Sequence, residues 1–322
     1  MRSFVRVLPL ALMAAIVAAA VAGAADAPPP WAYPVNPPGI QPAPDDGTLK
    51  HVPGSDAAFT LTQIRDLYNV PDWHPDNHPP MPDPVAHGSR PGVFACAYCH
   101  LPNGLGRPEN SSLAGLPAAY IVQQVADFKS GARKSSEPRD LPATLMIGVA
   151  QGATDANVRT AAEYFSALKP RPWIRVIESD TVPTTRVAGW MLVASQPGAT
   201  ESIGQRIIEM PENLERTELR DSASGFVAYV PVGSIEKGQA LVATGGAGKT
   251  IPCGICHGAD LKGLGPVPAL AGRSPSYIVR QLYDIQHGVR NGQWTELMKP
   301  VAAQLSEEDM VSIAAYTASR AP

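Results

Sequence analysis

The chain has 322 residues, a formal net charge of −3 and no basic patch, which excludes the usual electrostatic signature of a nucleic-acid-binding protein. Its length allows about two domains. With 34 prolines and 6% aromatic residues, these domains are expected to be rich in loops and to have modest side-chain cores.

The N-terminus has the three parts of a secretory signal peptide. Arg2 and Arg6 form the charged part, an apolar run follows over residues 7–21, and small residues end it at 22–25. The apolar run is shorter than the ~20 residues that a membrane-spanning helix needs. We therefore expect residues 1–25 to be cleaved near Ala24 or Ala25 during export. Residues 26–58, which are proline-rich and contain Trp31 and Tyr33, predict an extended arm.

A pentapeptide of the form C-x-x-C-H occurs twice, at residues 96–100 and 253–257, and uses every cysteine in the chain. This is the attachment signature of c-type haem. The two thiols bond the haem covalently, and the adjacent histidine binds its iron. The motifs predict two covalently bound haems c, with Cys96, Cys99, Cys253 and Cys256 as attachment residues and His100 and His257 as iron ligands.

Other functions of a C-x-x-C pair fit less well. A dithiol redox centre usually follows a strand in a βαβ pattern, and no such pattern leads into either motif. A structural zinc site would place two such pairs about 15–20 residues apart, far closer than Cys99 and Cys253. A structural disulfide would not need the histidine that follows both pairs.

The motifs belong to a longer internal repeat. Leu-Ala-Gly and Tyr-Ile-Val follow each motif at the same distance, and Gln124, Gly131 and Arg133 match Gln281, Gly288 and Arg290 without a gap. Apolar residues at helical spacing predict one amphipathic helix in each copy, facing the haem and other helices: Ile121, Val125 and Phe128, and Ile278, Leu282 and Ile285. Thr154 and Ser306 are expected to cap a final helix in each copy, and these helices carry the matched Tyr164 and Tyr316.

The repeat also selects a second iron ligand. Met146 and Met298 each lie eighteen residues before the matched tyrosines and are the only methionines that align. We therefore expect Met146 and Met298 to complete the iron ligation, with His87 as the main rival at the first site. The other rivals have no aligned counterpart of the same type: His74, His78, Met81, His287 and Met310.

The two copies differ before this methionine. The stretch from Arg133 to Met146 is five residues longer than the stretch from Arg290 to Met298. Residues 266–270 of the second copy offer backbone carbonyls that could accept a proton from the Nδ1 atom of His257. The first copy lacks the proline that matches Pro268, so the acceptor for His100 stays open.

At these residues the chain resembles the class I cytochromes c, and within them the bacterial periplasmic proteins with two such domains. The resemblance covers roughly residues 90–168 and 235–320. It implies a mainly α fold, a periplasmic location, and an N-terminal helix before each motif. We assign residues 234–242 and, in the first domain, residues 59–68 to that helix. The expected domains are residues 59–168 and 234–322, joined by a connecting segment, residues 169–233, with strands at 173–177, 190–194 and 226–230.

Two kinds of function remain open. Two His/Met-ligated haems leave no open iron position, which favours an electron carrier over an enzyme. Its partners would be a dehydrogenase or quinol-oxidising complex as donor and a terminal oxidase or reductase as acceptor, with possible peripheral membrane association. The alternative is a dihaem oxidoreductase enzyme or a cytochrome subunit of a dehydrogenase complex. That alternative gains ground if His87 rather than Met146 binds the first iron.

Overall fold

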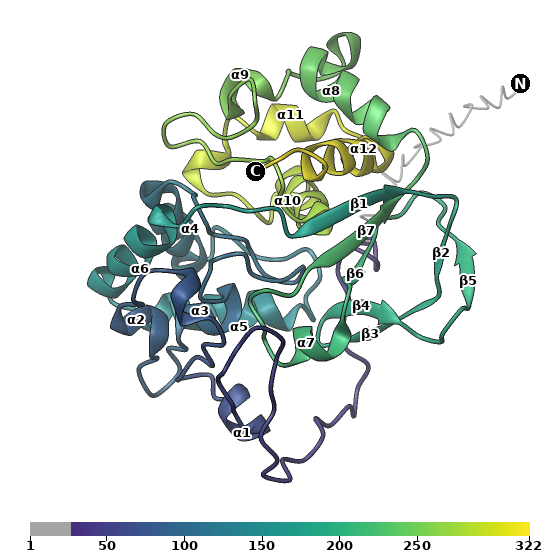
Figure 1. Ribbon diagram of the computed structural model, residues 1–322. Helices are drawn as coiled ribbons and strands as arrows, with labels where there is room; N and C mark the ends of the chain where they lie inside the picture. The colour runs from purple at the N-terminus through teal and green to yellow at the C-terminus, as the bar shows by residue number, and fades with distance from the viewer. Residues whose placement is uncertain (1–26) are drawn as a thin grey trace, which may run out of the picture.

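The computed structural model describes residues 27–322 (Figure 1). The expected signal peptide at residues 1–25 lies outside them. Two groups of helices hold the two C-x-x-C-H motifs, and a β-rich segment lies between them in sequence. The first unit contains α2 (Asp83–Ala86), α3 (Cys96–His100), α4 (Ala118–Ser130), α5 (Leu141–Gly152) and α6 (Asp155–Ala167). The second contains α8 (Ser234–Gly248), α9 (Gly254–His257), α10 (Pro275–Gln286), α11 (Lys299–Ala303) and α12 (Glu307–Ala318).

The predicted repeat helices are confirmed with their end signals. In the first unit, α4 begins after Pro117 and ends at Gly131, whose φ of 77° is a left-handed conformation that glycine adopts without strain. Thr154 caps α6 by accepting a hydrogen bond from the backbone of Asn157. Helix α4 packs against α5 and α6 around a core that includes Ile121 and Phe165. This core closes one side of the first motif.

The second unit is built around the crossing of α8 and α12. Ser306 and Asp309 form the predicted capping box at the start of α12. The backbones approach closely at Gly238 of α8, where a Cβ atom would lie 2.0 Å from the backbone oxygen of Ser312. Only glycine fits this crossing, which fixes the position of the helix that leads toward the second motif.

The expected N-terminal helix of the first domain is wrong. Residues 59–68 contain only α1 (Leu61–Ile64), a single turn capped by Thr60. Ile64 packs in a separate small core with Trp73 and Leu219 rather than across α6. The stretch fails as a helix because Asp66 and Asn69 hydrogen-bond to each other and to nearby backbone, which favours turns over a continuing helix. The first unit therefore has no counterpart of α8 within the described chain.

The middle segment, residues 169–233, contains every strand of the described chain. Its strands are β1 (Ile174–Glu178), β2 (Thr181–Pro183), β3 (Thr185–Ala188), β4 (Met191–Ala194), β5 (Thr200–Ser202), β6 (Ile208–Pro211) and β7 (Phe226–Val230), with α7 (Leu214–Glu218) before the last. The central strand β7 pairs in parallel with β1 and antiparallel with β6, in a register that sets Ile174 beside Phe226. The other strands form two antiparallel pairs, β2 with β5 and β3 with β4. The strands predicted from sequence correspond to β1, β4 and β7.

This segment contributes to the cores of both helical units. Trp173, Met191 and Phe226 pack in the core of the first unit, whereas Ile208 and Val230 pack in that of the second. Buried Glu209 of β6 adds a polar link, because its carboxylate accepts hydrogen bonds from the Ser274 hydroxyl (2.7 Å) and the Ser276 backbone (3.1 Å) at the start of α10. The middle segment therefore holds the two units together rather than acting as a simple spacer.

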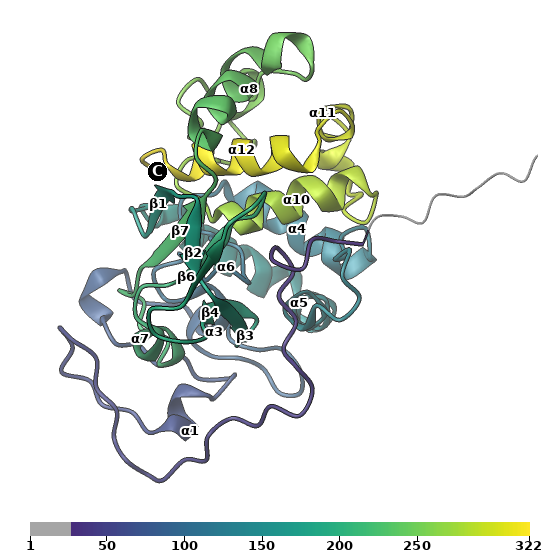
Figure 2. The same ribbon diagram turned by 90° about the vertical axis from the view of Figure 1, so that its right-hand side faces the viewer.

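The N-terminal arm follows an extended course around the molecule (Figure 2). Its start is anchored, since Trp31 and Tyr33 are buried in the core of the second unit. The Tyr33 hydroxyl donates to the Asp284 carboxylate of α10 at 2.7 Å, and Arg280 donates to the Ala32 backbone at 2.7 Å. The arm is extended as predicted, but it is also part of the core.

The predicted fold class is confirmed: the described chain is mainly helical, with two related helical units and some β structure between them. Among residues 27–322, no helix is both long and apolar enough to cross a membrane.

Candidate haem sites

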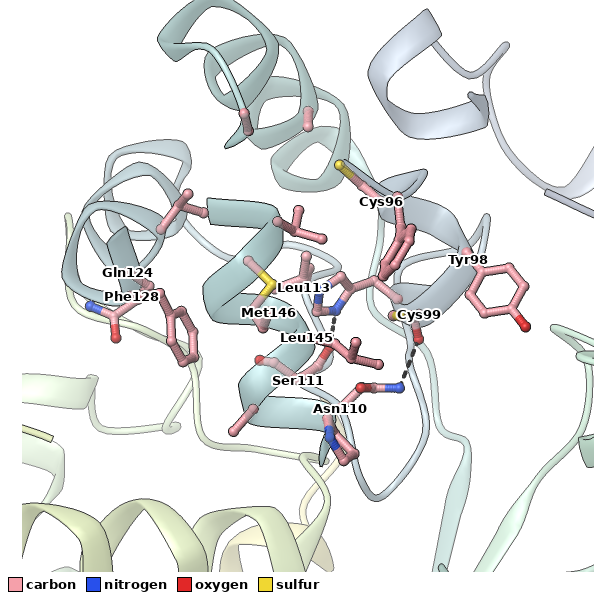
Figure 3. A pocket seen from close by; sticks show the side chains of 18 of the residues that line it. Cys96, Tyr98, Cys99, Asn110, Ser111, Leu113, Gln124, Phe128, Leu145 and Met146 are labelled. Carbon is pink, nitrogen blue, oxygen red and sulfur yellow. Dashed lines mark hydrogen bonds between the residues drawn. The ribbon is translucent and has the colours of Figure 1, made fainter. Parts of the chain in front are cut away.

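The first motif forms its own short helix, α3, which lies at the edge of a cavity of about 430 Å³ (Figure 3). Cys96, Cys99 and His100 all line this cavity. The Nδ1 atom of His100 donates to the backbone oxygen of Ser111 at 2.8 Å. The sequence left the acceptor for His100 open. In the structure the Ser111 carbonyl accepts this hydrogen bond, so no proline is needed at the position.

The second motif has the same local geometry. Cys253 stands at the start of α9, and the Nδ1 atom of buried His257 donates to the backbone oxygen of Pro268 at 2.8 Å. Pro268 aligns with Ser111, so the two histidines are oriented by carbonyls at equivalent positions of the repeat. In both sites the bond fixes the ring and directs the Nε2 atom away from the carbonyl, as an iron ligand requires.

Burial keeps both imidazoles in the form that binds a metal. It lowers the pKa of His100 and that of His257. The positive charge of Arg133 lowers the pKa of His100 further, and that of Arg290 does the same for His257. The hydrogen bonds to Ser111 and Pro268 only partly oppose this. Neutral imidazole is the metal-binding species, so both histidines are prepared as ligands.

The cysteines are poor candidates for thiolate chemistry. Burial raises the pKa of Cys96 to about 12 and that of Cys253 to about 11. A reactive catalytic cysteine needs the opposite shift. No disulfide joins any of the four cysteines.

The first cavity is lined by the side chains that a haem would need. Ile121, Val125 and Phe128 of α4 line it, as the stripe on the sequence predicted. Met146 of α5 lines it as well, and Figure 3 shows this side chain between Phe128 and the attachment helix. Two thiols, an imidazole and a thioether around an apolar space are the donor set of a His/Met haem c, so the residues present fit that group.

At the second site, Met298 directly precedes α11 as its N-cap residue. Met298 and Cys253 are both partly buried and each packs against the large core of the second unit. The structure thus brings Met146 to the cavity of the first attachment motif, whereas the place of Met298 beside the second motif stays a prediction.

The longer stretch before Met146 has a specific place. Ser136 donates from both its backbone nitrogen and its hydroxyl to Asp284 of α10, at 3.0 and 2.7 Å. The same carboxylate receives the Tyr33 hydroxyl. The extra residues therefore join the first unit to the second unit and the arm.

His87 also lines the first cavity, but its side chain is exposed and its Nδ1 atom lies 3.1 Å from the Asn69 side-chain oxygen. The remaining rivals are engaged elsewhere. His74 is buried, and its Nε2 atom lies 2.8 Å from the Asp221 carboxylate. His78 lies near Asp72 and the Tyr164 hydroxyl. His287 stacks on Tyr283. Met81 and Met310 pack in hydrophobic cores.

The matched arginines of the repeat exchange partners between the two units. Arg133 donates to the Tyr277 hydroxyl and the Gln281 side chain, both at 2.8 Å. In return Arg290 donates to the Tyr120 hydroxyl at 2.8 Å and the Gln124 side chain at 2.9 Å. The alignment marked these residues, but only the structure shows that each one binds the other copy.

Sequence reasoning missed Arg107 and Arg220, which both line the first cavity. Arg107 pairs with Glu109, and its aligned residue in the second copy is Leu264. Arg220 comes from the middle segment, far from the motif in sequence. No sequence signal marks it, because the repeat does not extend to that segment.

Comparison with known proteins supports the same reading. A family model described as "Cytochrome C oxidase, cbb3-type, subunit III" matches residues 235–316. Cytochrome c-552 of Acidithiobacillus ferridurans is 36% identical over 227 residues, which cover 70% of this chain and 73% of that protein. The thiosulfate dehydrogenase electron acceptor of Thiomonas intermedia is 27% identical over 235 residues, which cover 71% of this chain and 80% of that protein.

Among solved structures, cytochrome c4 of Acidithiobacillus ferrooxidans matches with a TM-score of 0.46 and 23% identity, over 70% of this chain and 98% of that one. The identity to cytochrome c-552, over most of both proteins, agrees with the two attachment motifs. The chain belongs to the bacterial dihaem c-type cytochromes, which bind haem c and transfer electrons.

Proposed function

We propose that this chain carries two covalently bound haems c and passes electrons through them without substrate chemistry at the iron. Cys96 and Cys99 would attach the first haem, with His100 and Met146 as its axial ligands. The corresponding residues for the second are Cys253, Cys256, His257 and Met298. The observation that carries the proposal is the equivalence of the two histidines, each bonded at 2.8 Å to a carbonyl at the same position of the repeat.

The haem supplies a one-electron change at iron, and the chain's residues set the conditions for it. The carbonyls of Ser111 and Pro268 orient the histidines and favour one tautomer. The apolar side chains of α4 that line the first cavity would pack against the haem and limit its contact with water. A methionine thioether as sixth ligand fills the last iron position and raises the reduction potential. Together these features favour electron transfer over binding of a substrate.

The partners would be redox proteins outside the cytoplasm. The apolar run at residues 7–21 supports export to the periplasm. A dehydrogenase or a quinol-oxidising complex would be the donor, and a terminal oxidase or reductase the acceptor. The similarity to thiosulfate dehydrogenase electron acceptors supports a dehydrogenase of a sulfur compound as one donor.

One observation keeps a second function in view. His87 lines the same cavity as Met146, which keeps it as the rival ligand of the first iron. In that case the chain would act as a dihaem oxidoreductase enzyme or as a cytochrome subunit of a dehydrogenase complex. The two functions differ in the ligand of the first iron, which can be measured directly.

The test is the long-wavelength absorption band of a ferric Met–iron bond, recorded for the purified holoprotein and for two variants. Met146→Ala and Met298→Ala should each remove about half of the band, because each iron contributes one thioether bond. If Met146→Ala leaves the band unchanged, Met146 is not a ligand and the enzyme reading gains support. Met81→Ala is the matched control and should leave the band intact.

A further inference from the structure

A loop of the middle segment, residues 217–222, lies directly against the first attachment helix. Within it Arg220 reaches into the first cavity. Its guanidinium donates to the backbone oxygen of Tyr98 at 2.7 Å and lies 3.6 Å from the centre of the Tyr98 ring. Tyr98 stands between Cys96 and Cys99, so this contact places a positive charge beside the attachment residues.

The loop is held in place by several further bonds. The Asn103 side chain donates to the Ser222 backbone oxygen at 2.5 Å, and Arg107 donates to that of Thr217 at 3.3 Å. The Trp73 indole donates to the Leu219 backbone oxygen at 2.7 Å. Arg220 itself has a φ of 57°, a conformation uncommon for a residue with a side chain. The surrounding contacts therefore fix the direction in which its side chain points.

Arg220 has no ion-pair partner in the described chain, although the Glu109 carboxylate interacts with it electrostatically. Arg107 forms an ion pair with Glu109, and both side chains are buried. No carboxylate of the described chain forms such a pair with Arg220. Burial and nearby Arg107 lower the pKa of Arg220, but a delocalised guanidinium bonded to a carbonyl and an aromatic face stays protonated at neutral pH. The first cavity thus gains one net positive charge from the middle segment.

The second site has no such cover. Tyr98, Asn103 and Arg107 are each 7% exposed, and they align with Ile255, Asp260 and Leu264. Ile255 is 66% exposed, Leu264 is 60% exposed and Asp260 is also exposed. The aligned face of the second unit is therefore open, and no residue of the middle segment takes the place of Arg220 there within the described chain.

We propose that Arg220 is a tuning residue that raises the reduction potential of the first haem relative to the second. The inference rests on the proposed function, since it needs a haem at each site. Reduction adds one electron to Fe(III) and gives Fe(II), with no bond or proton transferred. A fixed positive charge in a poorly hydrated site disfavours the oxidised state, which carries the larger positive charge. The protein would then hold its electron on the covered haem.

The experiment is a spectroelectrochemical titration of the holoprotein and its variants, after the haem content has been measured. Arg220→Met should lower one of the two haem reduction potentials and leave the other unchanged. Arg220→Lys keeps the positive charge and should leave both potentials close to their wild-type values. Met146→His, which replaces a thioether by an imidazole, identifies the step that belongs to the first haem. The matched control is Arg171→Met, because Arg171 bonds Ser222 of the same loop at 2.9 Å but does not line the first cavity.

A second variant gives the opposite sign and stands even if Arg220→Met does not fold. Glu109→Gln leaves Arg107 unpaired and should raise the first potential. The inference is overturned if Arg220→Met folds with two haems and leaves the first potential unchanged, if it does not fold and Glu109→Gln leaves that potential unchanged, or if Arg171→Met moves it as much as Arg220→Met does. These results would leave the proposed function intact. A wild-type haem content other than two per chain would instead refute the proposed function itself.

Discussion

The two attachment sites share a motif and a histidine hydrogen bond but differ in what surrounds them. The first is covered by the middle segment, which adds Arg220 and holds Tyr98 at 7% exposure. The second leaves the aligned Ile255 at 66% exposure. The comparison teaches that the repeated residues define the chemistry of a site, whereas residues outside the repeat decide its electrostatics and access.

The methionines carry a second contrast. Met146 lies within α5 and follows a stretch whose Ser136 bonds Asp284 of the other unit. Met298 is the N-cap residue of the short helix α11. The stretch before Met146 is therefore coupled to the interface between the units, and we expect changes at that interface to affect the first site more than the second.

The largest effect should come from removing one pair of attachment thiols. The first double variant replaces Cys96 and Cys99 by serine, and the second replaces Cys253 and Cys256. Each should reduce the covalent haem content from two per chain to about one, because the pairs act independently. Absorbance of the denatured alkaline pyridine complex measures this. Retention of two haems in either double variant would contradict the assignment of that pair.

The next effect concerns the exchanged arginines. Arg290→Gln removes charge-assisted hydrogen bonds to Tyr120 and Gln124 at the buried interface and should reduce the free energy of unfolding by about 2–4 kcal/mol. Lys129→Gln is the control, because its contact with Asp155 is exposed and should be worth less than about 0.5 kcal/mol. Denaturant titration of the holoprotein compares them. Equal effects would show that the exchange does not stabilise the interface.

A smaller effect distinguishes the two final helices by pH. Asp309 caps α12, whereas the aligned residue near the start of α6 is the uncharged Asn157. Burial opposes ionisation of Asp309, but hydrogen bonds from Lys249 and Ser306 outweigh it and lower the pKa of Asp309 to about 2. Its folded pKa lies below the unfolded value of 3.8, so its stabilisation is present above that value and is lost as the pH falls toward 2.

Asp309→Asn should therefore cost about 1–2 kcal/mol at neutral pH and reduce the acid dependence of unfolding between pH 3.8 and 2. Thermal unfolding followed over this pH range tests the expectation. Asn157→Ala, the matched change in the first unit, keeps the backbone donor of the cap and should change neither the stability by more than about 0.5 kcal/mol nor the pH profile. An unchanged profile in Asp309→Asn would contradict the role given to this carboxylate.

The smallest expected effect is that of His87→Ala. The side chain is exposed and contacts Asn69, so its removal should change the unfolding free energy by less than about 0.5 kcal/mol and leave the Met–iron band unchanged. Absorption spectra of the ferric and ferrous forms provide the measurement. A new high-spin spectrum or carbon monoxide binding in this variant alone would make His87 a ligand of the first iron.

Sequence reasoning predicted the features that depend on local pattern or on the repeat. Neighbouring residues encode each of these features, so the sequence alone reveals them. They are the capping residues Thr154 and Ser306, the apolar stripe of α4, and the strands β1, β4 and β7. The repeat also selected Met146, which lines the cavity of the first motif. Its role as an iron ligand, like that of Met298, stays a prediction.

The features it missed depend on contacts between distant segments. Residues 59–68 suggested a helix by position alone, although Asp66 and Asn69 favour turns. The approach of Arg220 to Tyr98 and the burial of Trp31 join parts of the chain that share no pattern. Such contacts leave no periodic signal, and only the folded chain shows them.

The most direct test of the account is the ferric spectrum of the wild-type holoprotein, with haem content and carbon monoxide binding measured on the same sample. Two haems per chain, a Met–iron band of the intensity expected for two thioether bonds, and no carbon monoxide binding to the reduced protein would support two closed His/Met sites. A band of half that intensity, or carbon monoxide binding at one or both irons, would contradict them.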